Sequence, residues 1–374
     1  MFGKKSHLAT SIFLVISLVL IFGCSDEPRK MTKVKEPSKM TDVKETPAKT
    51  METKTLVLYN WEEYIGSKTL ENFEKETGIH VQEINYEDEE DMLGAVQSDQ
   101  KTYDLIVASD DLIREMHESK ILALLDYSKI PNFKHISKQY INSPADPEQK
   151  YSVPYLFGTT GMVVNTKYVK ENTDSWQVLF DKRYKGKLAM LNNSFEVTCV
   201  ASKLLGYSIN DTSNEKFSKM TPKLHEQKLL LQGYMDVMAI KDLLIEEKLW
   251  AAQIYSGEGL AAVDENENLA YVIPKEGAPI WIDYFAVPRF AQHKEEAYIF
   301  LNYILRPEVN AAIASELWYA TPNEAATPHM DPEVIQSPSV YPPADVRARC
   351  EFFKDTGEAT PMFTKIWTDL LAKQ

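Results

Sequence analysis

Four short stretches of the sequence combine acidic and aromatic residues. They are Trp61, Glu62, Glu63 and Tyr64 in "YNWEEYI", Glu196 in "NNSFE", Tyr255 and Glu258 in "IYSGEG", and Trp281 and Asp283 in "WID". A carboxylate can replace water around a buried ammonium group. An aromatic face attracts cations and also offers an apolar surface to methylene groups. The combination therefore suits an organic polycation, in which ammonium groups are separated by methylene chains.

Each stretch also has a purely structural explanation. Asn60 could cap a helix with Glu63 as its capping-box partner. Trp281 could belong to the core and Asp283 to a turn. Taken singly, the stretches do not distinguish these alternatives, so their positions relative to the secondary structure decide the weight that they carry.

The sequence lacks the motifs of the common enzyme classes. There is no GxSxG, HExxH or GxxxxGK[ST] motif, and "GEGLAA" at Gly257 lacks the third glycine of a dinucleotide fingerprint. The seven histidines show no metal-ligand spacing, and the net charge of −14 argues against nucleic-acid binding. We therefore expect a protein that is not an enzyme and that has no cofactor, no metal site and no nucleic-acid partner.

Hydrophobic periodicity indicates the elements that position the acidic and aromatic residues. The first part alternates strand and helix: strands at 55–60, 79–86 and 103–109, and helices at 67–78, 89–99 and 110–120. This alternation predicts an α/β fold with parallel strands, in which ligands bind beyond the carboxyl ends of the strands. Trp61–Tyr64 follows the first strand and Ser109–Asp111 follows the third, so both fall at the expected ligand edge.

The second part of the chain repeats the pattern. Strands are expected within 151–165 and at 185–191, 249–256, 269–274 and 280–288, and helices at 194–206, 257–264, 294–305 and 307–317. Two α/β lobes joined by extended crossings are consistent with this order. The cleft between two such lobes is a natural ligand site.

The N-terminal residues have the features of an export signal. Lys4 and Lys5 precede an apolar run that ends at Phe22, which predicts a signal peptide at 1–23. The ending "IFGC" resembles a bacterial lipobox, in which Cys24 is lipidated; a transmembrane anchor is the alternative, but the run is short. Residues 24–54 are polar and contain the imperfect repeat "KMTKVKE"/"KMTDVKE", which predicts a disordered linker. Cys199 and Cys350 could form a disulfide bond, and the sequence leaves this open.

Several motifs give the chain from about Thr55 onward a resemblance to a known family. In order they are "YNWEEYI", "LENFEKETGIHV", "YDLIVAS", "YSVPYLFGTTGMVVN", "YKGKLAML", "LLGYS", "WIDYFAVP", "FLNYILRPEV" and "YATPN". The chain resembles the spermidine/putrescine-binding proteins of bacterial polyamine ABC transporters. The resemblance implies a two-lobed periplasmic-binding-protein fold (type II), each lobe a mostly parallel sheet flanked by helices, with the ligand cleft between the lobes. The expected lobes are 55–160 with 283–331, and 161–282 with 332–374.

The resemblance also implies the residues of the binding site. Three acidic residues, Asp283, Glu196 and Glu63, correspond to amine counter-charges. The remaining positions are the aromatic walls Trp61, Tyr64, Tyr255, Trp281 and Tyr319, together with Ser109 and Glu258.

The chain departs from the family pattern at three positions. Asn193 stands where spermidine-type members have aspartate, Asp111 where the family has tyrosine, and Phe353 aligns with a glutamine. Asn193 and Asp111 are kept among the expected ligand-binding residues. Glu62 is expected to point to solvent. Polyamine binding is expected, but the preference for ligand length is left open.

The resulting expectation is a lipid-anchored receptor on the periplasmic or outer face of a bacterial membrane. It would bind spermidine or putrescine and deliver it to the permease subunits of an ABC transporter. Two alternatives remain at this point: the same fold binding another small or cationic solute, or a surface lipoprotein with a role in adhesion or sensing.

Overall fold

The computed structural model describes residues 54–86, 89–98, 101–354 and 356–372. The predicted signal peptide, Cys24 and nearly all of the predicted linker lie outside the described residues. Lys54, which we expected to end the linker, is the first residue of strand β1. None of the helices in the described residues has the length and apolar character that crossing a membrane requires.

The strands, in chain order, are β1 (Lys54–Trp61), β2 (Ile79–Tyr86), β3 (Leu105–Ser109), β4 (Ser152–Asn165), β5 (Leu188–Leu191), β6 (Leu231–Met235), β7 (Ala251–Tyr255), β8 (Leu269–Val272), β9 (Pro279–Ala286) and β10 (Glu351–Phe352). The α-helices are α1 (Thr69–Thr77), α2 (Glu89–Ser98), α3 (Asp110–Glu118), α4 (Ser194–Leu204), α5 (Asn214–Lys228), α6 (Val237–Ile245), α7 (Ser256–Glu265), α8 (Lys294–Ile304), α9 (Pro307–Glu316), α10 (Pro332–Gln336), α11 (Ala344–Arg347) and α12 (Thr360–Ala372). Short 3-10 helices occupy Tyr127–Lys129, Pro131–His135, Lys138–Tyr140, Trp176–Phe180, Lys182–Tyr184, Thr327–His329 and Gly357–Ala359.

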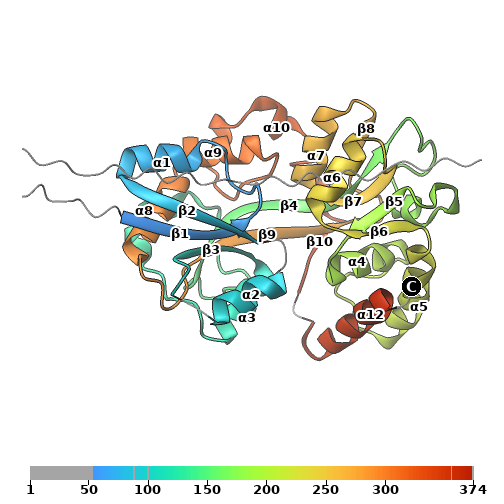
Figure 1. Ribbon diagram of the computed structural model, residues 1–374, viewed down its shortest axis with the longest axis horizontal. Helices are drawn as coiled ribbons and strands as arrows, with labels where there is room; N and C mark the ends of the chain where they lie inside the picture. The colour runs from blue at the N-terminus through green and yellow to red at the C-terminus, as the bar shows by residue number, and fades with distance from the viewer. Residues whose placement is uncertain (1–53, 87–88, 99–100, 355, 373–374) are drawn as a thin grey trace, which may run out of the picture. The chain divides into compact units, whose positions relative to one another are not determined.

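The strands form one mixed sheet with the order β2-β1-β3-β9-β4-β7-β5-β6. We call β2, β1 and β3 the β1 half, and β7, β5 and β6 the β5 half; the strands within each half are parallel. The antiparallel strands β9 and β4 lie side by side between them (Figure 1). The expected α/β fold is therefore confirmed.

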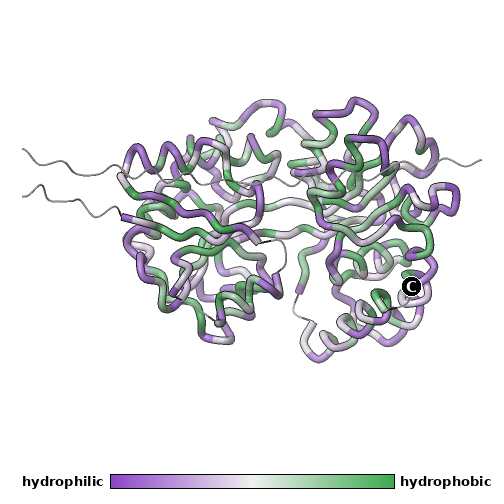
Figure 2. The backbone as a smooth tube through the Cα atoms, in the orientation of Figure 1, coloured by the Kyte–Doolittle hydropathy of each residue, from purple (hydrophilic) through white to green (hydrophobic). Residues whose placement is uncertain are grey.

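Strand β4 joins the two halves of the sheet. Residues 152–159 pair with β9, and residues 160–165 pair with β7 and β8. All fourteen residues of β4 are buried, which is typical of a strand covered on both faces. Hydrophobic stretches follow the strands in Figure 2, while along the helices hydrophobic and hydrophilic residues alternate.

Two hydrophobic cores support the sheet. The larger core contains the β1 half, β9 and α8, including Leu58, Ile106 and Phe300. The second core packs α4, α5 and α12 against β5, with Met190, Phe217 and Phe363 among its members. Strand β6 and helices α5, α6 and α12 were not among the elements that the sequence predicted.

Candidate functional site

One pocket lies at the ends of the strands where the sequence predicts ligand binding. Its volume is about 280 Å³. Most of the residues that line it stand at or just after the ends of β1, β2, β3, β5, β6 and β7, and the others belong to β9, the chain near Tyr319 and Phe353 after β10. Both halves of the sheet therefore contribute to the same cavity.

The structure brings eleven of the twelve predicted ligand-binding residues together in this pocket. They are Trp61, Tyr64, Ser109, Asp111, Asn193, Glu196, Tyr255, Glu258, Trp281, Asp283 and Tyr319. Glu63 is the exception. Its carboxylate lies 3.0 Å from Lys241 Nζ, and its side chain is 65% exposed.

The neighbouring residue Glu62, which we expected to point to solvent, is exposed and also lines the pocket. Glu63 has a positive φ of 52°, a turn conformation that is uncommon for residues other than glycine. Of these two adjacent carboxylates, Glu62 lines the cavity and Glu63 does not, and the sequence pattern did not reveal this.

The pocket lining is strongly acidic. Eight of its residues are acids: Glu62, Glu89, Asp110, Asp111, Glu196, Asp236, Glu258 and Asp283. Among the residues that the structure describes, the lining contains no lysine, arginine or histidine. Such a surface attracts cations and repels anions.

Most of these acids stand at the start of a helix that follows a strand. Glu89 opens α2, Asp110 opens α3, and Glu196 and Glu258 lie in the first turns of α4 and α7. Asp236 caps α6 and accepts hydrogen bonds from two backbone N–H groups. The partial positive charge of a helix N-terminus stabilises the ionised form of a carboxylate, which helps the protein to keep several acids in one cavity.

Asp283 differs because it lies within strand β9 and lacks a helix N-terminus. It is opposite Ser109 of β3 and only 7% exposed. Burial, followed by the nearby carboxylates of Glu89 and Glu258, raises the pKa of its carboxyl to about 7 against an opposing interaction with the Tyr64 hydroxyl. A cation that binds next to Asp283 would favour the ionised carboxylate and lower this pKa.

Glu196 is a second buried carboxylate, with 4% exposure. Thr160 Oγ1 donates a hydrogen bond to it over 2.8 Å, and Gln253 Nε2 donates to its backbone carbonyl over 2.9 Å. Burial raises the pKa of Glu196 to about 8 despite the bond from Thr160, and Glu89 raises it as well. Asp110 is half-buried, and desolvation together with the charge of Asp111 raises its pKa well above the usual range.

Aromatic rings form a continuous wall beside Asp283. Trp281 meets Tyr255 and Tyr319 edge to face, with ring centroids 5.8 and 5.1 Å apart, and Tyr319 meets Tyr64 at 5.5 Å. The Tyr319 hydroxyl donates a hydrogen bond of 2.5 Å to Glu258. The rings therefore hold one another and one of the acids in place.

Two glycines leave the space that these rings occupy. A Cβ atom on Gly158 of β4 would come within 2.7 Å of the Trp281 ring. A Cβ atom on Gly257 would overlap the Tyr319 ring. Since real Cβ atoms do not approach a ring so closely, both positions require glycine for the wall to keep its shape.

Asn193 and Asp111, which depart from the family pattern, and Ser109, which lies opposite Asp283, have distinct environments. Asn193 Oδ1 accepts from the backbone N–H groups of Phe195 and Glu196, so it caps α4. Asp111 forms an ion pair of 2.6 Å with Arg114. Ser109 Oγ is buried and has no hydrogen-bond partner among the described residues, so its lone pairs are available to a ligand.

Sequence reasoning missed several residues of the pocket. They are Tyr86, Glu89, Asp110, Leu191, Asn192, Phe195, Met235, Asp236, Val237 and Met238. Tyr86 is the last residue of β2 and Glu89 stands shortly after it, so the rule about strand ends could have found them. Met235 is the last residue of β6 and Asp236, Val237 and Met238 come next, but β6 was not among the predicted strands. Phe353 was noted only as a departure from the family pattern.

Other candidate chemistries have little support. Cys199 and Cys350 are both free thiols, so the structure does not contain the disulfide that the sequence left open. Within the described part of the chain, no three His, Cys, Asp or Glu side chains are grouped so that they could hold a metal ion.

The comparisons with known proteins agree with this geometry. The model of the bacterial extracellular solute-binding protein family matches residues 68–342. The chain belongs to this family of solute-binding transport proteins, and its fold is of the two-lobed periplasmic type.

Similar proteins define the relationship more closely. The putrescine-binding periplasmic protein PotF of Escherichia coli is 34% identical over 340 residues, which cover 85% of this chain and 91% of that protein. A solved structure from Listeria monocytogenes has 32% identity and a TM-score of 0.80, with 86% and 100% of the two chains covered. The spermidine/putrescine ABC transporter substrate-binding protein PotD of Streptococcus pneumoniae has 29% identity and a TM-score of 0.74, with 85% and 98% covered. The resemblance to polyamine-binding proteins is thus confirmed.

Proposed function

We propose that this protein is a receptor that binds a polyamine in its acidic, aromatic pocket and presents it to an ABC permease. The observation that carries the proposal is the lining of the pocket, which contains eight acids and, within the described part of the chain, no basic residue. A small polycation is the class of solute that this lining matches best. Relatives that are named as putrescine-binding and spermidine/putrescine-binding proteins support the same class of solute.

Within the pocket, Asp283 and Glu196 are the two principal amine partners. Asp283 would accept hydrogen bonds from one ammonium group, with Ser109 Oγ as a neutral acceptor beside it. Glu196, in the first turn of helix α4, would accept hydrogen bonds from a second ammonium group. The rings of Trp281, Tyr255 and Tyr319 would line the methylene chain between them.

We further propose that Cys24 carries the lipid that holds the protein on the extracytoplasmic face of the membrane. The residues between Cys24 and β1 would tether the ligand-binding part of the chain. This part would close on the ligand and be recognised by the permease. The export signal in the sequence and the periplasmic relatives support this placement. No catalytic step is needed for this role.

Isothermal titration calorimetry of residues 52–374 with putrescine and spermidine tests the proposal. Glutamate and sodium chloride at matched ionic strength serve as negative controls. We expect saturable one-to-one binding of at least one polyamine with a Kd in or below the micromolar range, and none for glutamate. Heat changes indistinguishable from those of the salt control would contradict the proposal.

The carboxylate variants locate the site. Asp283→Asn should lose most of the affinity, whereas Glu63→Gln removes an equal charge from outside the pocket and should retain it. Equal losses in the two variants would show that the effect comes from net charge and not from the pocket.

A further inference from the structure

The three parallel strands of the β5 half have two opposite edges, and only one of these edges belongs to the pocket. Leu191, Met235 and Tyr255, which end β5, β6 and β7, line the pocket. The other edge contains the residues that come just before the three strands. Because the strands are parallel and begin at paired residues, these preceding residues are neighbours in space.

Backbone hydrogen bonds connect the segments at this other edge. The Gly186 N–H donates to the Leu230 carbonyl over 2.8 Å, and the Trp250 N–H donates to the Lys187 carbonyl over 2.8 Å. Asn165, the last residue of β4, donates its N–H to the Trp250 carbonyl over 2.8 Å. Four parts of the chain that are far apart in the sequence therefore meet at one edge of the sheet.

We call the surface at this edge the basic face, because it has an excess of positive charge. Residues 166–187 contain six Lys and Arg residues but three Asp and Glu residues, whereas the whole chain has a net charge of −14. The side chains that define the face are Lys167, Tyr168, Lys170, Lys182, Arg183, Tyr184, Lys185, Lys187, Leu229, Lys248 and Trp250. The described lining of the pocket includes none of them.

The basic face also contains aromatic rings. Tyr168 stacks on Trp250, with ring centroids 4.6 Å apart and an angle of 13° between the ring planes. Tyr184 meets Trp250 edge to face at 6.2 Å. Tyr168 and Trp250 are half-buried, so part of each side chain stays in contact with solvent. Trp and Tyr side chains, which join an apolar ring to a polar group, are typical of membrane–water interfaces.

Lysine side chains lie over these rings. Lys187 Nζ is 5.6 Å from the centre of the Trp250 ring, and Lys167 Nζ is 5.1 Å from the centre of the Tyr168 ring. Cations and partly exposed aromatic rings are therefore mixed on one surface. A surface that binds lipid headgroups needs both kinds of group, because the headgroup region is charged on its outside and apolar below.

The acids near the basic face neutralise only some of its cations. Glu171 and Asp181 both pair with Arg183, at 3.0 and 2.6 Å. The other ion pairs nearby join Lys167 to Glu247, Lys248 to Glu246 and Lys275 to Asp174. Lys182 and Lys185 are exposed, and neither takes part in an ion pair between described residues. Their charges are therefore available to a partner outside the molecule.

An exposed apolar side chain stands next to these lysines. Leu229 is 67% exposed, and it precedes Leu230, whose carbonyl accepts from the Gly186 N–H between Lys185 and Lys187. An apolar side chain among cations strengthens binding to a lipid surface, where it can leave water. It adds nothing to the binding of a soluble polyanion, which depends on charge.

We infer that the basic face is a docking surface for an anionic lipid membrane. Negative headgroups attract the Lys and Arg side chains, and the Trp, Tyr and Leu side chains can enter the headgroup region. The eight acids of the pocket lie at the opposite edge of the β5 half, and the same membrane repels them. Contact through the basic face would therefore leave the pocket open to the solution. The inference goes beyond the proposed function, because this contact requires neither the ligand nor the lipid on Cys24.

Vesicle sedimentation tests the inference with the chain from residue 24 onward carrying Cys24→Ser, which cannot be lipidated. One set of vesicles contains phosphatidylcholine alone, and the other contains about 30% phosphatidylglycerol. We expect binding to the anionic vesicles that weakens as salt is added, and at least about tenfold weaker binding to phosphatidylcholine alone.

Paired charge reversals locate the contact. Lys182→Glu combined with Lys185→Glu should weaken binding to the anionic vesicles by at least about tenfold. The matched control combines Lys134→Glu with Lys138→Glu, which alters two exposed lysines outside the basic face and changes the net charge equally. It should weaken binding by less than about threefold. Leu229→Ser should weaken binding by about two- to fivefold and leave its salt dependence unchanged.

Three results would overturn the inference: no binding to the anionic vesicles at low salt, equal losses in the two lysine pairs, or binding to soluble heparin as tight as to the vesicles. Calorimetry with putrescine and spermidine keeps the inference separate from the proposed function. The Lys182→Glu, Lys185→Glu variant should bind polyamine like the wild type, because neither residue lines the pocket. Absence of polyamine binding by the wild type would contradict the proposed function and leave the membrane contact standing.

Discussion

The two walls of the pocket differ in what they supply. The wall from the β1 half and β9 contains five acids: Glu62, Glu89, Asp110, Asp111 and Asp283. The wall from the β5 half, together with Phe353, contains three acids among a larger set of apolar residues: Leu191, Phe195, Met235, Val237, Met238 and Phe353. Each wall holds one of the two proposed amine partners, Asp283 or Glu196, but the first wall has more acids and the second has more aliphatic residues.

This asymmetry separates affinity from selectivity. Long-range attraction of a polycation depends on the summed charge, so the acid-rich wall dominates encounter and binding strength. Contacts with the apolar wall are short-ranged and distinguish ligands by where their uncharged segments lie. Substitutions on the two walls should therefore have different signatures.

The largest effect is expected for Asp283→Asn on the acid-rich wall. This change leaves one buried ammonium without its counter-charge, and we expect polyamine affinity to fall by at least ~100-fold. Calorimetry measures the loss, and circular dichroism checks the fold. Retention of wild-type affinity would show that Asp283 is not an amine partner.

The next largest effect is the dependence of affinity on pH. Burial raises the pKa of Asp283 to about 7 and of Glu196 to about 8, so both carboxyls hold protons in the empty pocket at mildly acidic pH. An ammonium ligand must displace these protons, so affinity should rise from pH 6 to pH 8.5 by about tenfold or more. Titrations in buffers of different ionisation enthalpy should show release of about one proton near pH 7.5.

The same groups make the empty protein more stable in mild acid. The folded state binds protons that the unfolded chain releases above pH 5, so their contribution to the free energy of unfolding falls as the pH rises through 7 and 8. In Glu196→Gln the fall in the free energy of unfolding should end near pH 7 instead of near pH 8. Thermal unfolding across the pH range checks it, and an unchanged profile in the variant would show that Glu196 does not titrate there.

A smaller effect is expected for Trp281→Leu, which keeps an apolar side chain but removes the aromatic face. Loss of a cation–π contact worth about 0.5–2 kcal/mol corresponds to roughly two- to thirtyfold weaker binding. Because Leu still covers the methylene chain, the pH dependence should stay the same. Calorimetry at two pH values separates this aromatic effect from that of the acids.

The smallest effect is expected for Glu63→Gln. The Glu63–Lys241 ion pair is largely exposed on the Glu63 side, and such pairs contribute about 0–1 kcal/mol to stability. Polyamine affinity should stay within about twofold of the wild type. A much larger loss would place Glu63 in the bound site after all.

Much of the site could be predicted from the sequence because the strand-end rule is local. Trp61, Glu196, Tyr255 and Asp283 follow or occupy recognisable apolar strands, and the structure brings them together. The side that a residue faces in a turn depends on single backbone angles, which residue types do not reveal. Glu62 lines the pocket, whereas Glu63, which has a positive φ, does not.

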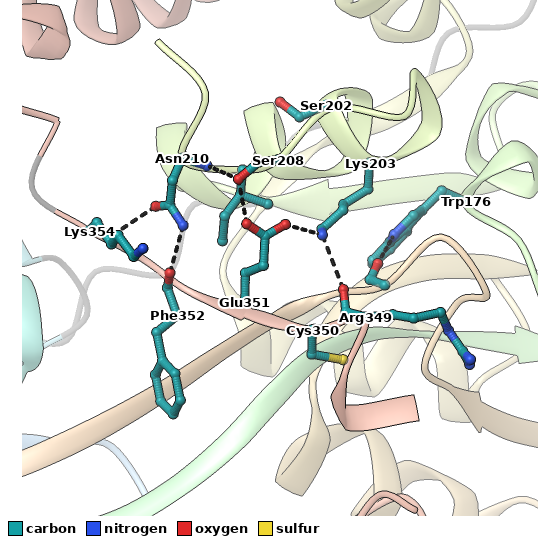
Figure 3. Close-up of polar contacts among 12 residues, drawn as sticks. Trp176, Ser202, Lys203, Ser208, Asn210, Arg349, Cys350, Glu351, Phe352 and Lys354 are labelled. Atoms are coloured by element: carbon teal, nitrogen blue, oxygen red, sulfur yellow. Dashed lines mark hydrogen bonds and ion pairs between the residues drawn. The ribbon is translucent and has the colours of Figure 1, made fainter. Parts of the chain in front are cut away.

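The parts that could not be predicted depend on tertiary packing. Strand β6 has polar and half-buried residues, so it gives little hydrophobic signal, and Asp236 after it was missed. Phe353 lines the pocket in a segment that Lys203 of α4 and Asn210 of the connection between α4 and α5 bind, roughly 140 residues earlier in the sequence (Figure 3). Such a contact has no local pattern.

Trp281 lines the pocket and packs closely against Gly158, which does not line it, so a substitution at position 158 would change the pocket indirectly. An added methyl group at position 158 would need the space of the indole ring, 2.7 Å away, and would push that ring toward the ligand. The set of residues that touch the ligand would be unchanged, yet the cavity would become narrower. Among homologues, a difference in ligand size could therefore arise from a glycine that never contacts the ligand.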